Sequence, residues 1–147
     1  SRFSLRCYCI HCDDMNFSIA TDKEGFQVTA AAQLLGDDLL VTCTGGDKPH
    51  IGAVAVAYPR PSINDPEKLS ASANVICLSG HREDELARSA ALKLCRAIGR
   101  TVTVVAGMHW DKIDAQGIRQ VVANVEELID RLCNELTYRM GGKDGEA

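Results

Sequence analysis

The segment from Ala73 to Gly107, ANVICLSGHREDELARSAALKLCRAIGRTVTVVAG, decides the fold. It opens with a short apolar run over residues 73–78 that indicates a strand, and it closes with the β-branched run from Thr101 to Ala106, typical of a buried strand. Between the two runs, apolar residues recur at helical spacing up to Gly99, which is expected to end the helix. A strand, a helix and a strand of this length predict a right-handed crossover between two parallel strands.

Upstream of this segment, apolar and polar residues alternate from Asn16 to Pro59, which is the pattern of half-buried strands. Turn signals divide this region into four expected strands, which begin near Phe17, Phe26, Leu39 and Ile51. Since short turns connect them, we expect the four strands to form an antiparallel meander. The proline-rich stretch from Pro59 to about Ser72 predicts an exposed loop.

Downstream of the segment, the sequence predicts one more helix. Asp114 is a good N-cap, and apolar residues step by three and four from Ile118 to Leu136. Gly141 and Gly142 are expected to end this helix. The resulting order, β-β-β-β-β-α-β-α, predicts an α+β fold: a single mixed, mostly antiparallel sheet of about six strands with two helices packed on it.

The first residues differ in composition from the rest of the chain. We expect residues 1–15 to be an N-terminal leader or an expression remnant and residues 16–147 to form a single α+β domain. The cluster CYCIHC at residues 7–12 offers four soft ligands, but its spacing does not fit a standard zinc knuckle. Other cysteines stand singly in apolar segments, as buried thiols of a reducing compartment do. These are Cys43, Cys77, Cys95 and Cys133.

Composition excludes several classes of function. The 147 residues carry a formal net charge of -4, whereas a nucleic-acid-binding protein normally has a basic patch that neutralises phosphates. No apolar run is long enough to span a bilayer, and the pattern of a secretory signal is missing. We therefore expect a cytoplasmic protein that binds neither nucleic acid nor a membrane.

Three of the four histidines follow glycine-marked strand ends, in TGGDKPH (44–50), SGH (79–81) and GMHWD (107–111). Ligand sites in crossover units gather at the carboxyl ends of the strands, which places the second and third histidines at one edge. The first histidine joins that edge if the strand from Leu39 runs parallel to the two crossover strands. Each histidine also has a plainer interpretation, as a turn residue, a residue of a helix first turn or a strand terminus.

The residues around the histidines leave more than one ligand open. Trp110, the single tryptophan, offers a stacking surface for a planar ligand, and glycine N–H groups together with a helix N-terminus favour a phosphate. The acidic run of residues 83–85 opposes a phosphate unless Arg82, Arg60 or Lys48 offsets it. The alternative is a small metal-binding protein or metalloenzyme in which histidines ligate zinc or iron. Its expected ligands are His50, His81 and His109, with Asp47 or Asp111 as a further group. A structural dimeric subunit without a ligand is the third hypothesis.

Three stretches of the chain resemble, in this order, the signatures of the LpdD-like prenylated-flavin chaperones: TGGDKPHIGAV, SGHREDELARSAA and VVAGMHWDKI. This family is also known as the small D-type subunit associated with gallate decarboxylase and other UbiD-type decarboxylases. The resemblance extends over roughly Phe17 to Leu136. It implies a fold akin to proteasome assembly chaperones and the formation of a homodimer. It also implies a non-catalytic role: holding prenylated FMN, or FMN, and assisting its delivery to a UbiD-type decarboxylase, with a flavin prenyltransferase as a further expected partner.

Carried over by position, the signature residues of the family are expected to bind the cofactor. They fall on Gly45, Gly46, Asp47, His50, Gly80, His81, His109, Trp110 and Asp111. Neither a nucleophile in a recognisable elbow nor a pair of carboxylates suited to hydrolysis is evident in the sequence, which agrees with an accessory protein rather than an enzyme.

Overall fold

The computed structural model describes residues 15–78, 80 and 82–144. Its elements follow the chain in the order β1 (Phe17–Thr21), the 3-10 turn η1 (Lys23–Gly25), β2 (Val28–Leu35), β3 (Asp38–Gly46), β4 (Ala53–Pro61), β5 (Leu69–Cys77), α1 (Asp84–Ile98), β6 (Val102–His109) and α2 (Ala115–Asp144). The CYCIHC cluster and His81 lie outside the described residues. Met15, the last residue of the expected leader, buries its side chain in the core.

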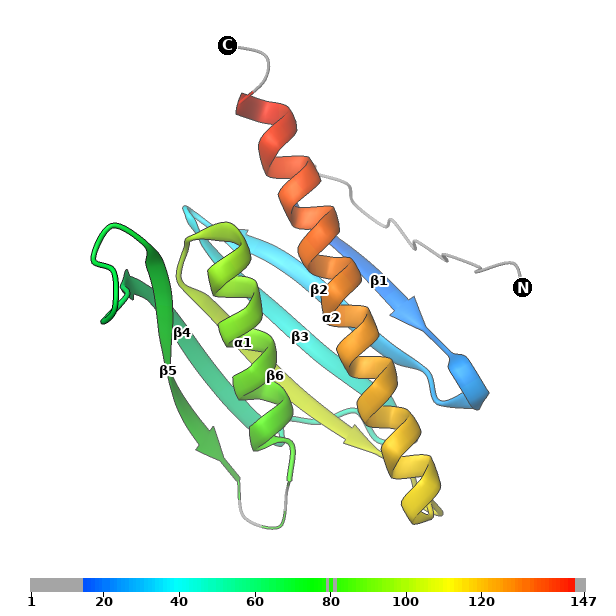
Figure 1. Ribbon diagram of the computed structural model, residues 1–147. Helices are drawn as coiled ribbons and strands as arrows, with labels where there is room; N and C mark the ends of the chain where they lie inside the picture. The colour runs from blue at the N-terminus through cyan, green and yellow to red at the C-terminus, as the bar shows by residue number, and fades with distance from the viewer. Residues whose placement is uncertain (1–14, 79, 81, 145–147) are drawn as a thin grey trace.

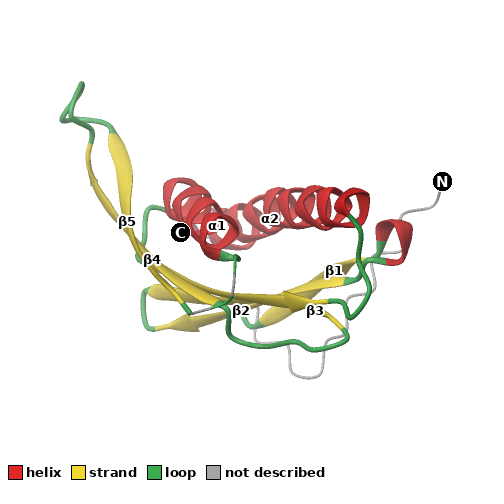
Figure 2. Ribbon diagram, turned by 90° about the horizontal axis from the view of Figure 1, so that it is seen from below, coloured by secondary structure: helices red, strands yellow, loops and turns green. Residues whose placement is uncertain are grey.

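The strands form one six-stranded sheet in the order β1-β2-β3-β6-β4-β5, and both helices lie on the same face of it (Figures 1 and 2). Only β3 and β6 pair in parallel, while the other four neighbouring pairs are antiparallel. The predicted α+β class, with a mixed and mostly antiparallel sheet, is therefore confirmed. None of the helices in the described part of the chain combines the length and the apolar character that a membrane span needs.

The predicted strand-helix-strand connection between two strands of the same direction is confirmed as well. Both β5 and β6 are antiparallel to β4, so they run in the same direction, and α1 connects them across the sheet. The helix can pack closely on the sheet because small side chains on its inner face meet small side chains of β4. These buried alanines are Ala87, Ala90 and Ala91 on the helix and Ala53, Ala55 and Ala57 on the strand.

The expected four-stranded meander is wrong at its last step. β1, β2 and β3 pair in sequence, but β6 lies between β3 and β4. The alternation of residues identifies each strand without fixing its neighbour. β6 carries Val102, Val104 and Ala106, all buried, on the helix side, and such an apolar strand gains most from a central position.

The expected loop from Pro59 to Ser72 is also shorter than predicted, because β4 continues to Pro61 and β5 begins at Leu69. β4 pairs with β6 only as far as Ala57, and beyond that residue it pairs with β5 alone. Prolines are tolerated there because a missing N–H costs nothing on a side without a neighbouring strand. The resulting two-stranded ribbon projects from the rest of the sheet (Figure 2).

Two further boundaries test the sequence patterns. Gly99 ends α1 in the left-handed conformation with φ 66°, as predicted. Gly141 does not end α2, which continues to Asp144, because a glycine stops a helix only where the backbone turns left-handed and Gly141 has no positive φ.

The four single cysteines have different environments. Cys43 and Cys95 are buried as expected, and Cys133 is half-buried. Cys77 is exposed, contrary to expectation, because it ends the edge strand β5.

Candidate ligand-binding site

The carboxyl ends of β3, β5 and β6 lie at one edge of the sheet, because the three strands run in the same direction. Gly46, the last residue of β3, pairs with His109, the last residue of β6. The loop after β3 then returns along β6, where the His50 N–H donates to the carbonyl of Gly107 at 3.5 Å. The first histidine was expected at this edge only if the strand from Leu39 runs parallel to the two crossover strands. β3 does run parallel to them, so this condition is confirmed.

Hydrogen bonds between the two histidine-bearing loops hold them together. The Asp47 N–H donates to the His109 carbonyl at 2.7 Å, and the Lys48 N–H donates to the same oxygen at 3.3 Å. In return, the Asp111 N–H donates to Oδ2 of Asp47 at 3.0 Å. The carboxylate of Asp111 also lies 3.3 Å from Nε2 of His109 and 3.6 Å from Nζ of Lys48. Asp47 and Asp111 therefore stabilise the conformation of the two loops.

Gly45 and Gly46 lie against Trp110 and neighbouring backbone. A Cβ on Gly46 would stand 2.1 Å from the His109 carbonyl oxygen and 2.9 Å from Cδ2 of Trp110, and Gly46 has a φ of 82°. A Cβ on Gly45 would stand 2.4 Å from the carbonyl oxygen of Gln27. Gly46 thus lets β6 and the indole approach β3, and Gly45 makes room for the backbone of Gln27. The indole also packs against Phe26 in a T-shaped arrangement, with 5.6 Å between the ring centroids.

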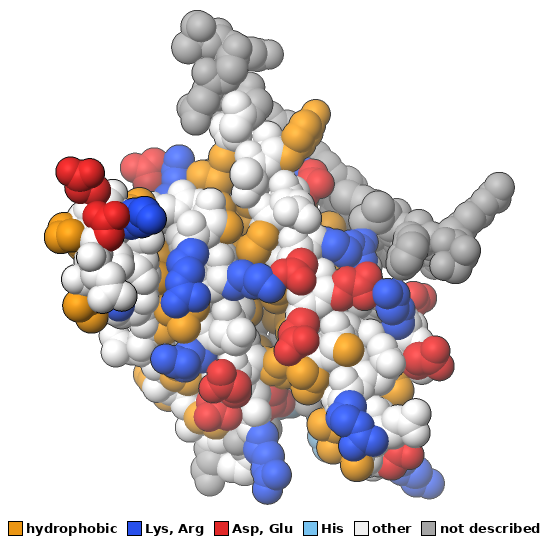
Figure 3. Space-filling view, viewed as in Figure 1, with side chains coloured by type: hydrophobic (Ala, Val, Ile, Leu, Met, Phe, Trp, Pro, Cys, Tyr) orange, Lys and Arg blue, Asp and Glu red, His pale blue; other side chains and the backbone are white. Residues whose placement is uncertain are grey.

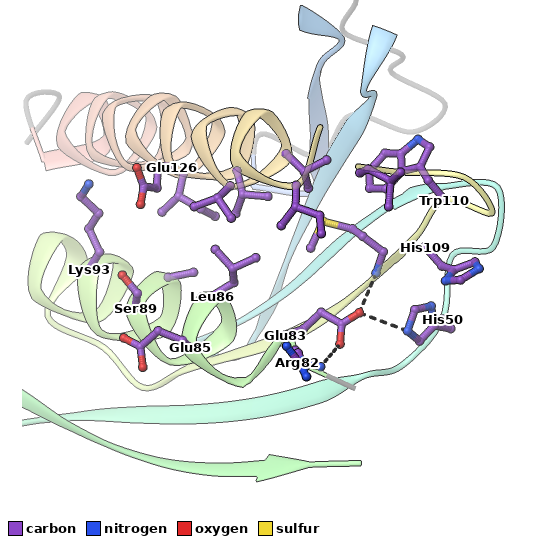
Figure 4. Close-up of a pocket in the computed structure, with 18 of the residues that line it drawn as sticks. His50, Arg82, Glu83, Glu85, Leu86, Ser89, Lys93, His109, Trp110 and Glu126 are labelled. Carbon is purple, nitrogen blue, oxygen red and sulfur yellow. Dashed lines mark hydrogen bonds and ion pairs between the residues drawn. The ribbon is translucent and has the colours of Figure 1, made fainter. Parts of the chain in front are cut away.

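A pocket of about 570 Å³ opens between α1 and α2 above this edge (Figure 4). Figure 3, viewed toward the helices, shows hydrophobic side chains between the charged side chains that the helices turn outward. The apolar lining comes from α1, β6, the loop after β6 and α2. It consists of Leu86, Ala90, Met108, Ile113, Ile118, Val121, Val122, Val125 and Ile129.

Polar groups gather at the two ends of the pocket. His50, Arg82, Glu83, His109 and Trp110 meet at one end, and Ser89, Lys93 and Glu126 lie at the other (Figure 4). Of the residues predicted to bind a cofactor, His50, Gly80, His109 and Trp110 belong to the lining. Gly45, Gly46, Asp47 and Asp111 are not part of it and support the loops that carry it. His81 lies outside the described residues.

Comparison with known proteins shows the family to which the chain belongs. Residues 22–137 match the family described as the prenylated flavin chaperone LpdD-like domain. The chain belongs to the LpdD-like family of prenylated flavin chaperones. Protein LpdD of Lactiplantibacillus plantarum is 25% identical over 111 residues, which cover 76% of this chain and 78% of that protein. A chain in the crystal structure of a chaperone complex for yeast 20S proteasome assembly superposes with a TM-score of 0.49 at 17% identity, covering 81% of this LpdD-like chain and 96% of the other.

Glu83 is the principal residue of the LpdD-like pocket that the sequence did not single out. Its carboxylate contacts the ring of His50 and accepts hydrogen bonds from the backbone N–H groups of Arg82 and Met108 (Figure 4). The only signal was its position just before α1. There, an acidic residue is ordinarily explained by the helix dipole.

The contribution of α2 was also missed. Its apolar stripe was predicted, but a stripe that lines a pocket has the same spacing as one that packs in a core. At the far end of the pocket, Lys93 contacts Asp130 of α2, and the hydrogen bond to that carboxylate raises the pKa of Lys93. This contact lies on the solvent side, so it ties the helices only weakly.

The metal-binding alternative has no support within the residues that the structure describes. No group of three or more His, Cys, Asp or Glu side chains in residues 15–78, 80 and 82–144 is placed to hold an ion. The imidazoles of His50 and His109 each face a different carboxylate, of Glu83 and Asp111 respectively.

Proposed function

We propose that this chaperone holds prenylated FMN in the pocket between α1 and α2 and assists the maturation or assembly of a UbiD-type decarboxylase. The observation that carries the proposal is the pocket itself, apolar between the two helices and ending at imidazole, guanidinium and indole groups. Membership of the LpdD-like family supports a chaperone role, and with it a partner protein that receives help.

The lining fits the chemistry of such a cofactor. Its volume of about 570 Å³ falls among pockets that take small organic ligands, roughly 300–1,000 Å³. Aliphatic side chains from α1 and α2 would contact a flat ring system with a hydrocarbon addition, whereas Arg82, His50 and His109 would meet its phosphate or its polar ring edge. The cofactor would supply its chemistry in the decarboxylase, and the residues of this chain would bind it and keep water from it.

Fluorescence offers a direct test of binding, because Trp110 is the single tryptophan and lines the pocket. Titration of FMN into the purified protein is expected to quench this fluorescence saturably. Co-expression with a flavin prenyltransferase is expected to yield protein with a flavin-type absorption spectrum, and metal analysis of the same sample checks the alternative. Absence of quenching together with a colourless protein after co-expression would remove the proposal.

A pair of matched variants locates the site. Val122→Phe fills space in the apolar lining and is expected to weaken FMN binding roughly tenfold. Val56→Phe places the same side chain on the opposite face of the sheet and is expected to bind as the wild type does. Equal affinities in the two variants would place the flavin elsewhere.

The decarboxylase step needs its own assay. A UbiD-type decarboxylase would be co-expressed with the flavin prenyltransferase, with the wild-type chain or with Val122→Phe, and its bound flavin measured after purification. Greater flavin occupancy with the wild-type chain supports the assistance. Equal occupancy with the wild type, with the variant and without the chain counts against it.

A further inference from the structure

The carboxylate of Glu83 joins three segments at one end of the pocket. Its Oε2 accepts the Arg82 N–H at 3.0 Å, and its Oε1 accepts the Met108 N–H at 3.3 Å. Oε1 also lies 3.2 Å from Nε2 of His50, and the Glu83 side chain is only 12% exposed. A single group thus connects the N-terminus of α1, strand β6 and the loop between β3 and β4 (Figure 4).

The two ring nitrogens of His50 both face oxygen acceptors. Nδ1 lies 2.8 Å from the carbonyl oxygen of Lys48, and Nε2 lies 3.2 Å from Oε1 of Glu83. A backbone carbonyl and a carboxylate accept hydrogen bonds and donate none. Both contacts are hydrogen bonds only when each ring nitrogen carries a proton, so the geometry suits an imidazolium that is ion-paired with Glu83.

Gly52 makes room for this carboxylate. A Cβ on Gly52 would stand 2.5 Å from Oε2 and 2.8 Å from Cδ of Glu83. Gly52 does not have a positive φ, so its backbone conformation is open to alanine. The glycine is needed for the position of the carboxylate.

We propose that Glu83 is a positioning residue of the ligand pocket: it fixes His50 as an imidazolium at the pocket end and holds the β3–β4 loop closed against α1. The part that concerns the ligand rests on the proposed function. Because this contact orders the β3–β4 loop before the ligand arrives, the binding free energy does not include the entropic cost of ordering that loop. Without the contact, this cost weakens ligand binding. Glu83 acts through His50 and carries out no chemistry.

The first arm of the test uses no ligand. Nitrogen-15 NMR at pH 7 of the histidine-labelled protein, with His50 assigned from His50→Gln, is expected to show two protonated ring nitrogens. In Glu83→Gln the amide keeps a hydrogen bond but donates to Nε2, so His50 is expected to become neutral with its proton on Nδ1. Asp84→Asn removes the same charge from the same turn of the helix, away from the pocket lining, and is expected to leave the spectrum of His50 unchanged.

The second arm measures FMN affinity through Trp110 fluorescence. Glu83→Ala and Gly52→Ala are each expected to weaken binding roughly tenfold, since a hydrogen bond to a charged group is lost. Glu83→Gln is expected to stay within about threefold of the wild type and Asp84→Ala to match it. Gly52→Ala introduced into Glu83→Ala is expected to add nothing, because the carboxylate that it displaces is gone.

The outcomes separate the two proposals. A neutral His50 in the wild type, or an unchanged His50 in Glu83→Gln, overturns the ion pair whether or not flavin binds. Binding by Glu83→Ala and Gly52→Ala as tight as that of the wild type overturns the positioning role. Failure of the wild type to bind any flavin overturns the proposed function, while the NMR arm still decides the ion pair.

Discussion

Gly46→Ala is expected to separate the ends of β3 and β6. The new methyl group would stand 2.1 Å from the His109 carbonyl oxygen and 2.9 Å from Cδ2 of Trp110, far inside van der Waals contact. The same carbonyl accepts the N–H groups of Asp47 and Lys48, so these two hydrogen bonds are expected to lengthen or break. One substitution thereby disturbs both histidine-bearing loops.

The magnitude has two parts. Moving an L-residue into the left-handed region costs about 1–2 kcal/mol, and overpacking against a backbone carbonyl costs about 1–3 kcal/mol. Together they lower the free energy of unfolding by about 2–5 kcal/mol, a large share of the roughly 5–15 kcal/mol of an ordinary domain. Gly36→Ala isolates the first part, because Gly36 has a φ of 62° and a Cβ there would meet nothing within 4 Å.

The measurement is urea unfolding followed by the fluorescence of Trp110. Gly46→Ala is expected to be less stable than Gly36→Ala by about 1–3 kcal/mol, and its native emission is expected to shift because the indole must move. If the two variants agree to within about 0.5 kcal/mol, the steric account of the β3–β6 contact is refuted.

Three further predictions concern the supports of the fold. Asn124→Ala is expected to lower the free energy of unfolding, measured by chemical denaturation, by about 2–4 kcal/mol, because this fully buried amide donates to two backbone carbonyls. Asn74 is exposed, so the control Asn74→Ala is expected to change that free energy by no more than about 0.5 kcal/mol. Asp114→Ala is expected to lower the free energy of unfolding by about 1 kcal/mol in the same assay, because Oδ1 of Asp114 accepts the Gly117 N–H at 2.7 Å. Asp114→Asn keeps a capping oxygen and is expected to keep most of the stability. Equal losses of stability in the two variants would show that the cap does not matter. Burial raises the pKa of Cys43 from 9.0 to about 12, so the native thiol keeps its proton after the unfolded one has lost it. Stability therefore falls between about pH 9 and 12, by up to ~1.4 kcal/mol per pH unit, and Cys43→Ala is expected to show a shallower fall in unfolding measured across that range; identical slopes would contradict the assignment.

The fold was predictable where local chemistry decides it. The apolar segment before Gly80, the helical spacing up to Gly99 and the β-branched run from Thr101 specified the crossover, and the crossover set the direction of two strands. The neighbours of each strand were not predictable in this way. The place of β6 between β3 and β4 depends on the burial gained in the assembled sheet, which leaves no mark on the alternation of residues.

The site shows the same division. Glycine-marked strand ends indicated the loops of His50 and His109, and both side chains line the pocket. Gly46 was expected to bind the cofactor, and in the structure it contacts Trp110 and β6 and is not part of the pocket lining. Glu83 was missed because the helix dipole accounts for an acid at that position, and only the assembled fold brings His50 and Met108 to its oxygens.

The central position of β6 has a consequence for synthesis on the ribosome. β1 to β3 and the β4–β5 ribbon are translated before Val102–His109, yet this strand is the one that joins them. Until it leaves the exit tunnel, the inner edges of β3 and β4 have no partner, and α2, which covers β1 and β2, follows later still. The nascent chain thus presents two open strand edges from the emergence of β4 until β6 follows, and the domain completes its fold only after α2 has emerged.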